Sequence, residues 1–153
     1  MITLHKISND EELKELVKLQ MMYFNDTSFI PMDFASSFIS FKKGLSHGGY
    51  ARIIRNNQEI IGWICAQKVK VSYSKYDILN QIMYCCLSDG IEALQALKLS
   101  HQGLVDYAEA SKIPYVMSAS SHFDEDNRLA IILEKLGWQR RGYLAVYKTS
   151  YAN

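Results

Sequence analysis

"DNRLAIILEKLGWQRRGY" (126–143) is the stretch of this sequence that decides the fold. Within it, Leu129, Leu133 and Leu136 recur at helical spacing, which predicts a short amphipathic helix. Gly137 directly follows the last of them and is a typical stop at a helix C-terminus. The run that comes next, "WQRRGYLAVYKT", alternates polar and apolar residues and predicts a final strand. The C-terminal region is therefore expected to be a short helix that ends at a glycine and leads into a strand.

The N-terminal region predicts a strand and then two helices. "ITLHKI" (2–7) has strand-like composition, and the following segment carries Ser8 and Glu11 at capping-box spacing before an apolar periodic run. Pro31 stands near the start of a second helix. That helix is indicated by four apolar residues at helical spacing, which are Phe34, Phe38, Phe41 and Leu45.

The middle of the chain predicts three strands and a long helix. "YARIIRNNQEIIGWICAQKVKV" (50–71) reads as a hairpin that turns at Asn56 and Asn57, because asparagine tolerates a positive φ. "YDILNQIMYCCLS" (76–88) is a third strand, and Asp89 is the candidate N-cap of the helix after it. The apolar face predicted for that helix comprises Ile91, Leu94, Leu97, His101, Leu104, Val105 and Ala108. His101 is expected to be a buried, hydrogen-bonded side chain rather than a catalytic one.

Adding the short strand "PYVMSAS" (114–120) gives the element order β-α-α-β-β-β-α-β-α-β. The chain has 153 residues, and we expect one domain over 1–153. Lys and Arg number 17 against 16 Asp and Glu, so net charge gives no reason to expect a nucleic acid or an anionic membrane as partner. No apolar run is long enough to span a membrane and no leader pattern is seen, which favours a cytoplasmic protein. The spacing of Cys65, Cys85 and Cys86 suggests free thiols rather than a disulfide framework or a metal site.

This element order resembles that of the GCN5-related N-acetyltransferase (GNAT) superfamily, whose members usually end in a helix of the form Asn-x-x-Ala…Tyr-Glu-Lys-Leu-Gly-Phe before a strand. The best match is "EKLGW" (134–138), and "RNNQEIIGWICAQ" (55–67) is similar to the central hairpin of the family. The resemblance implies an α/β, GNAT-like (acyl-CoA N-acyltransferase) fold. Such a fold has a mixed, mostly antiparallel sheet flanked by helices.

The resemblance also implies a place for acetyl-CoA. In the family the fourth and fifth strands splay apart, and the exposed backbone of the fourth strand binds the pantetheine arm. Carried over, that backbone belongs to Cys86, Leu87 and Ser88. Amides at the start of the next helix would hold the pyrophosphate, which is an anion at the positive end of a helix dipole.

The family's phosphate loop has the form Arg or Gln, two residues, Gly, one residue, then Gly or Ala. Aligning from the strand end places Ile91, Leu94 and Ala96 on these three positions, so that Leu94, Gln95 and Ala96 are the predicted contacts. Ala96 alone matches the pattern. The nearest glycine to the helix start is Gly90.

Anchoring the terminal motif on Gly137 places Asp126 at the family's asparagine, with Asn127 one residue away, and both are candidate cofactor contacts. Leu133 falls on the tyrosine that often protonates the departing thiolate of CoA, and leucine cannot donate a proton. A replacement would have to be another tyrosine, for example Tyr84, Tyr107 or Tyr143. Among carboxylates, Glu59 and Asp77 lie near the central strands, but the sequence singles out neither as general base.

Two functions follow from the resemblance. The first is an N-acetyltransferase that transfers an acetyl group from acetyl-CoA to an unidentified amine, on a small molecule or a protein, by direct attack on the thioester. The second is a catalytically degenerate protein of the same fold, virus-encoded in some relatives, that acts as a binding or assembly component. The second function would involve a homo-oligomer or a protein partner.

Overall fold

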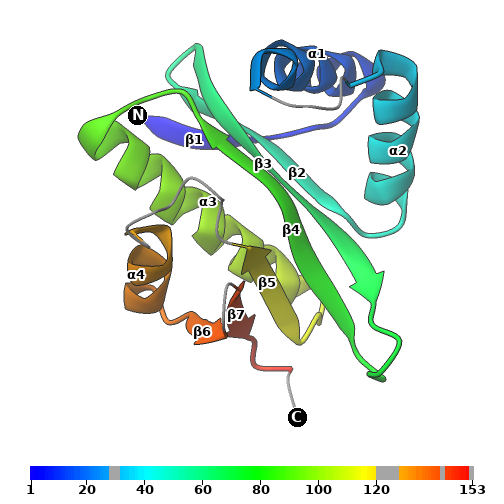
Figure 1. The fold of residues 1–153 in the computed structure, drawn as a ribbon, viewed down its shortest axis with the longest axis vertical. Coiled ribbons are helices and arrows are strands. Elements are labelled where there is room, and N and C mark those ends of the chain that lie inside the picture. The colour runs from blue at the N-terminus through cyan, green and yellow to red at the C-terminus, as the bar shows by residue number, and fades with distance from the viewer. Residues whose placement is uncertain (28–31, 120–127, 142–143, 152–153) are drawn as a thin grey trace.

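The computed structural model describes residues 1–27, 32–119, 128–141 and 144–151 of the chain (Figure 1). In chain order its elements are β1 (Ile2–Lys6), α1 (Asp10–Thr27), α2 (Phe34–Ser46), β2 (Tyr50–Asn56), β3 (Glu59–Lys70), β4 (Asp77–Cys86), α3 (Gly90–Ala110), β5 (Tyr115–Ala119), α4 (Arg128–Lys135), β6 (Gln139–Arg141) and β7 (Leu144–Lys148). The predicted element order is confirmed except at the end, where one predicted strand is a hairpin of two. Within the described residues, no helix is long and apolar enough to cross a bilayer.

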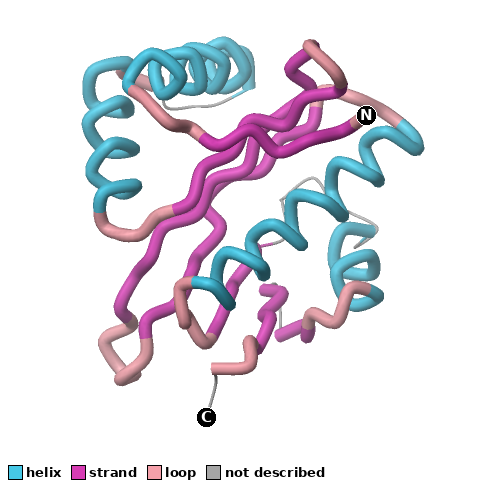
Figure 2. The backbone as a smooth tube through the Cα atoms, turned by 180° about the vertical axis from the view of Figure 1, so that it is seen from behind, coloured by secondary structure: helices cyan, strands magenta, loops and turns pink. Residues whose placement is uncertain are grey.

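The strands form one sheet in the order β1-β2-β3-β4-β5-β7-β6. Only β4 and β5 pair in parallel, and every other described pair is antiparallel. Helices α1 and α2 cover one face and α3 and α4 cover the other (Figures 1 and 2). The expectation of a mixed, mostly antiparallel sheet between helical layers is confirmed.

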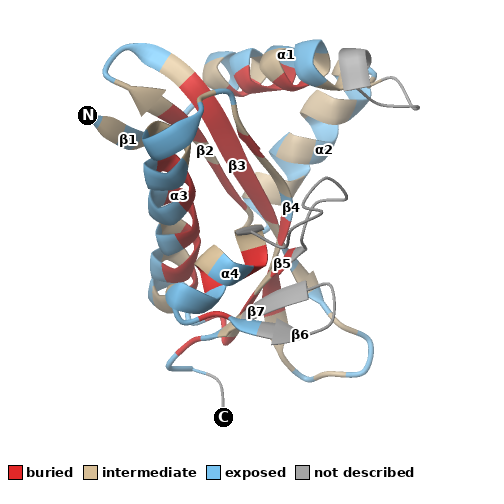
Figure 3. Ribbon diagram, turned by 60° about the vertical axis from the view of Figure 1, so that its left-hand side comes forward, coloured by how far each residue is buried: buried red, intermediate tan, exposed pale blue. Residues whose placement is uncertain are grey.

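Strand β3 is an inner strand between β2 and β4 and is buried from Ile61 to Ala66 (Figure 3). Trp63 and Cys65 face α1 and pack in a cluster with Leu16, whereas Ile64 faces α3 and packs in a cluster with Leu104. Successive side chains of a strand point to opposite faces. A strand buried on both sides therefore reads as the nearly unbroken apolar run that the sequence shows.

Two residues that the sequence predicts at chain reversals, Asn57 and Gly137, have a positive φ. Asn57 has φ 54° in the β2–β3 turn, and Gly137 has φ 90° after α4. The helix end is closed by the Trp138 amide, which donates to the Leu133 carbonyl oxygen at 3.0 Å. Positive φ costs little for glycine and is tolerated by asparagine, which is why these residues mark the two sites.

Two details of the helices differ from prediction. The first helix is capped by Asn9, whose side-chain oxygen accepts from the Glu12 amide at 2.9 Å, one residue later than the predicted Ser8–Glu11 box. At the start of α3, Ile91 is 77% exposed and Leu94 is 36% exposed, so neither belongs to the buried face. Both lie in the first two turns of α3, before its first buried residue, Ala96. The predicted role of Pro31 falls outside the described residues.

Candidate functional site

The candidate site is the place where β4 and β5 part. Their parallel pairing covers Ile78 to Gln81 on β4, and Gln81 opposite Ser118 is the last pair. Strand β4 continues to Cys86 with β3 on one side but, among the described residues, no strand on the other. Its backbone from residue 82 onward therefore presents unpaired amide and carbonyl groups along one edge, which can bond an extended ligand.

A β-bulge marks the same point. Cys65 of β3 stands opposite Met83, but the next residue, Ala66, stands opposite Gln81, so Ile82 is an extra residue in β4. A bulge bends its strand and increases the local twist. The bend falls immediately after the last pair with β5, which gives a physical reason for the two strands to diverge there.

Beyond the bulge, β4 is held tightly to β3. Gly62 of β3 stands opposite Cys86, and a Cβ atom at Gly62 would lie 2.2 Å from the Cys85 carbonyl oxygen. The Leu87 amide adds a further bond to the Ile61 carbonyl oxygen at 2.8 Å. Glycine is required for this approach, and the approach keeps the end of β4 away from β5.

Helix α3 begins at the open end of this strand. Asp89 is the N-cap with extended backbone but makes no side-chain cap bond, and Gly90 follows with φ 59°. The first amides of a helix have no partner within the helix. Here these amides form the positive end of the helix dipole, and no side chain among the described residues caps them. Such an arrangement binds anions. The one acidic residue of the first turn, Glu92, accepts a hydrogen bond from the Asn56 side-chain amide.

The predicted contacts on β4 and its loop lie at this opening. Cys86 is half-buried, and its thiol lies 3.8 Å from the Ser88 carbonyl oxygen as donor. Leu87 is 55% exposed and Ser88 is partly exposed. The structure therefore brings all three residues to the mouth of the strand opening.

The three predicted contacts on the helix lie differently. Leu94, Gln95 and Ala96 are four to six residues past the helix start at Gly90, so their amides donate within the helix. Ala96 is fully buried against Ile54. The amides free to meet a ligand are those of residues 90 to 92, one turn earlier than the predicted set.

A buried polar cluster, the fork cluster, joins the last β4–β5 pair to α3. It consists of Gln81, Ser118 and His101, and sequence reasoning missed the first two. Gln81 Oε1 lies 2.9 Å from His101 Nε2 and accepts a hydrogen bond from Ser118 Oγ at 2.6 Å. His101 Nδ1 lies 2.9 Å from the Leu97 carbonyl oxygen. The available signal was the polar residues inside two otherwise apolar strand segments, Asn80 and Gln81 in one and Ser118 in the other.

The histidine of the fork cluster is neutral. Burial lowers the pKa of His101 to about 4, so the neutral ring carries one N–H. Ser118 Oγ donates to Gln81 Oε1, and the single ring N–H of His101 serves one of two acceptors, the Leu97 carbonyl oxygen at Nδ1 or Gln81 Oε1 at Nε2, according to the tautomer. The buried, uncharged role predicted for His101 agrees with this geometry.

The candidate proton-transfer groups are only partly assembled. Leu133 is 1% exposed and packs in the α3-side core, so α4 offers no acid at that position. Tyr84 lies on the free segment of β4, and Tyr107 donates its hydroxyl to the Gly48 carbonyl oxygen at 3.0 Å. Asp77 pairs with Lys68 at 3.2 Å, and Glu59 is exposed beside the β2–β3 turn. Asp126, Asn127 and Tyr143 lie outside the described residues.

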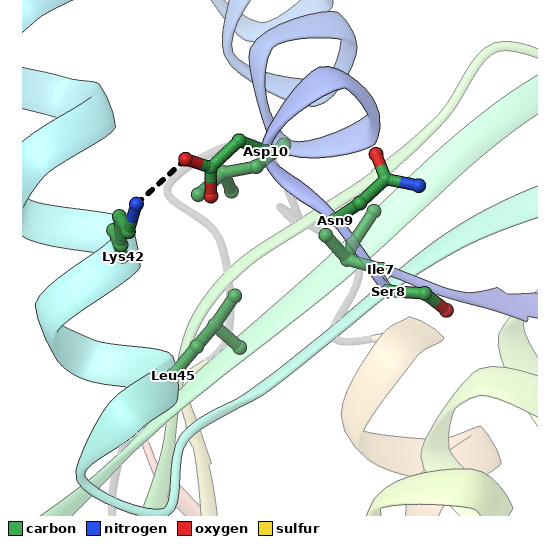
Figure 4. A pocket seen from close by; sticks show the side chains of 7 residues that line it. Ile7, Ser8, Asn9, Asp10, Lys42 and Leu45 are labelled. Atoms are coloured by element: carbon green, nitrogen blue, oxygen red, sulfur yellow. Dashed lines mark hydrogen bonds and ion pairs between the residues drawn. The ribbon is translucent and has the colours of Figure 1, made fainter.

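A separate surface hollow lies between the start of α1 and α2 (Figure 4). Lys42 of α2 reaches across it to Asp10 at 2.6 Å. The hollow is lined by Ile7, Ser8, Asn9, Asp10, Leu13, Lys42 and Leu45. None of these residues belongs to β4, β5 or α3, and its charges are already paired, so we interpret it as a packing feature between two helices.

No protein-family model and no curated protein matches this sequence. Solved structures do resemble the fold. An acetyltransferase of the GNAT family from Streptococcus pneumoniae superposes with TM-score 0.70 at 12% identity, covering 98% of this chain and 100% of the other. NAA60 from Arabidopsis thaliana, in complex with a bisubstrate analogue, gives TM-score 0.70 at 13% identity, covering 99% and 100%. The yncA protein from Salmonella typhimurium, with its cofactor acetyl-CoA, gives TM-score 0.71 at 8% identity, covering 96% and 93%.

Proposed function

We propose that this chain, which has the fold of the GNAT acetyltransferases, transfers an acetyl group from acetyl-CoA to an amine. The observation that carries the proposal is the open edge of β4 leading to the uncapped start of α3. Such an edge can bond the amides of a pantetheine arm as it would an added strand. The helix start suits the pyrophosphate at the other end of that arm.

Within this proposal the phosphate cradle consists of the amides of Gly90, Ile91 and Glu92. Gly90 has φ 59° and nothing within 4 Å of where a Cβ would stand, so a ligand can approach the backbone. Ile91 supplies no charge where the family often has a polar or cationic side chain. Affinity therefore depends on backbone donors and on the helix dipole, and we expect weaker binding than a cationic loop would give.

When bound, acetyl-CoA supplies an activated acetyl thioester. The contribution of this chain is chiefly to orient that group along β4 and to exclude water beside the fork cluster. The fork cluster is uncharged at neutral pH, and it joins β4, β5 and α3 at the point where the strands part. It thereby holds the opening in one shape. The acceptor is an amine whose size and charge are set by residues around the opening.

Calorimetry with acetyl-CoA is the direct test, because a ligand that binds only the folded chain releases or absorbs heat and raises the unfolding temperature. A variant with Ile91→Glu places a negative charge at the cradle and should weaken binding, whereas Gln102→Glu adds the same charge mid-helix and should not. Release of the CoA thiol with a panel of amines then tests transfer. Absence of heat and of a thermal shift at millimolar acetyl-CoA would reject the proposal.

A second function is favoured by one observation, the apolar rim of the opening. Leu87 and Ile91 are 55% and 77% exposed, and they flank the same helix start. Exposed apolar groups that adjoin one another often mark a protein interface. A chain that binds a partner or a second copy there, without catalysis, would show a concentration-dependent mass in solution. It would lose that mass change with Ile91→Glu and would give no thiol release.

A further inference from the structure

The Tyr84 hydroxyl is a buried hydrogen-bonding group that the described part of the fold does not use. Its oxygen is buried and has no hydrogen-bond partner among the described residues. Burial raises the pKa of Tyr84, and the neighbouring Cys86 thiol adds a smaller effect in the same direction. The phenol therefore keeps its proton and acts as a donor. A buried donor left without an acceptor costs stability. An unpaired group of this kind is therefore a candidate for a ligand contact.

The neighbours of Tyr84 have other partners. The ring of His101 meets the Tyr84 ring edge-on at 5.3 Å, but both His101 nitrogens are occupied, one by the Leu97 carbonyl and one by Gln81. The Cys86 thiol is close enough to help raise the pKa of Tyr84, but its hydrogen is directed to the Ser88 carbonyl oxygen at 3.8 Å. The described surroundings thus position the Tyr84 ring and, among these residues, supply no hydrogen-bond acceptor for its hydroxyl.

The position of Tyr84 connects this spare donor to the opening. It lies three residues beyond Gln81, the last residue of β4 that pairs with β5, and two residues after the bulge at Ile82. It packs with Cys86 and Ala96 under the first turns of α3. The residue therefore stands between the parting of the strands and the uncapped start of the helix.

We propose that the Tyr84 hydroxyl donates a hydrogen bond to the bound acyl donor, either to its thioester group or to an amide carbonyl of its pantetheine arm. This inference rests on the proposed function, because it requires that ligand in the β4–β5 opening. The role is that of a binding contact on the ligand. Of the two tyrosines named from sequence that the structure describes, it selects Tyr84, since the Tyr107 hydroxyl already donates to the Gly48 carbonyl oxygen.

The test compares Tyr84→Phe with Tyr107→Phe as a matched control, each in the full chain. Tyr84→Phe should weaken acetyl-CoA binding about tenfold in calorimetry, the effect of one lost hydrogen bond. Its unfolding temperature without ligand should equal or exceed that of the parent chain, because the hydroxyl has no acceptor in the described structure. Tyr107→Phe should show the opposite pattern, a lower unfolding temperature with unchanged affinity.

Free CoA distinguishes the two acceptor atoms. If Tyr84→Phe weakens acetyl-CoA and CoA equally, the acceptor is a pantetheine amide; if it weakens only acetyl-CoA, the acceptor is the thioester. Equal acetyl-CoA affinity in Tyr84→Phe and the parent chain would overturn the inference and leave the proposed function intact. A parent chain that fails to bind acetyl-CoA would overturn the proposed function itself, and the inference with it.

Discussion

Replacement of Gly62 by alanine tests whether the close approach of β3 and β4 shapes the opening. The added Cβ would lie 2.2 Å from the Cys85 carbonyl oxygen and 3.1 Å from the Cys86 Cα. These are backbone atoms, which cannot rotate away as a side chain would, so the strands must separate by roughly 1 Å to reach ordinary contact. That movement strains the ladder on both sides of Gly62, including the bond from the Leu87 amide to Ile61.

We expect Gly62→Ala to lower the free energy of unfolding by about 3 kcal/mol, from overpacking together with weakened ladder bonds. For a domain of this size that is roughly a 6–12 °C fall in unfolding temperature. Urea denaturation followed by tryptophan fluorescence measures it, since Trp63 and Trp138 are buried.

The matched control is Gly44→Ala in α2, where the nearest atoms to a new Cβ are 3.8 Å away on the Gln67 side chain. Alanine inside a helix should be neutral or slightly stabilising there. If Gly62→Ala were as stable as Gly44→Ala, the strand approach would not be as tight as the structure has it, and the account of how β4 is held would be wrong.

Three other outcomes are expected. Burial lowers the pKa of His101 from 6.5 to about 4, so the unfolded chain binds the proton more readily than the folded chain. The contribution of this ring to the free energy of unfolding should be complete above pH 6.5 and fall by about 3 kcal/mol as the pH drops to 4. His101→Gln should flatten that slope in acid unfolding, and an unchanged slope would count against a buried neutral ring. Asp33 accepts from the Ser36 amide at 2.7 Å whereas Asp89 makes no side-chain cap bond, so Asp33→Ala should lower the unfolding temperature more than Asp89→Ala; equal effects would contradict the cap assignment. Ile91→Lys should tighten acetyl-CoA binding several-fold at low salt, with loss of the gain at high salt, and Gln102→Lys should leave the affinity unchanged; a salt-independent or absent gain would argue against a phosphate at the helix start.

The order of elements was predictable because each element carries its own local pattern. Gly137 and Asn57 mark chain reversals that their residue types tolerate, and β3 is apolar from Ile60 to Ala66 because both of its faces are buried along that stretch. Errors arose where neighbouring residues offered equal choices, as with Asn9 in place of Ser8 at the first helix cap. The final hairpin was read as one strand because its two short strands share a single alternating pattern.

Part of the candidate site was named from the sequence, and part of it is visible only in the structure. The resemblance placed it at the end of β4, where Cys86, Leu87 and Ser88 do lie at the mouth of the opening. It placed the helix contacts at Leu94 to Ala96, one turn beyond the free amides, because the motif was aligned by counting residues from the strand end. The start of α3 at Gly90 is a structural fact that such counting cannot supply.

By itself the sequence determined the elements, their order, the GNAT-like fold class and the expectation that His101 is buried. These properties depend on periodicity and on backbone preferences within a few residues. The tertiary structure alone decided that Ile82 is a bulge, that Gln81 and Ser118 close the fork and that Gly62 lies against Cys85. It also decided that the Tyr84 hydroxyl has no hydrogen-bond partner among the described residues. Each of these depends on register and contact between residues tens of positions apart, and no local pattern encodes such a pairing.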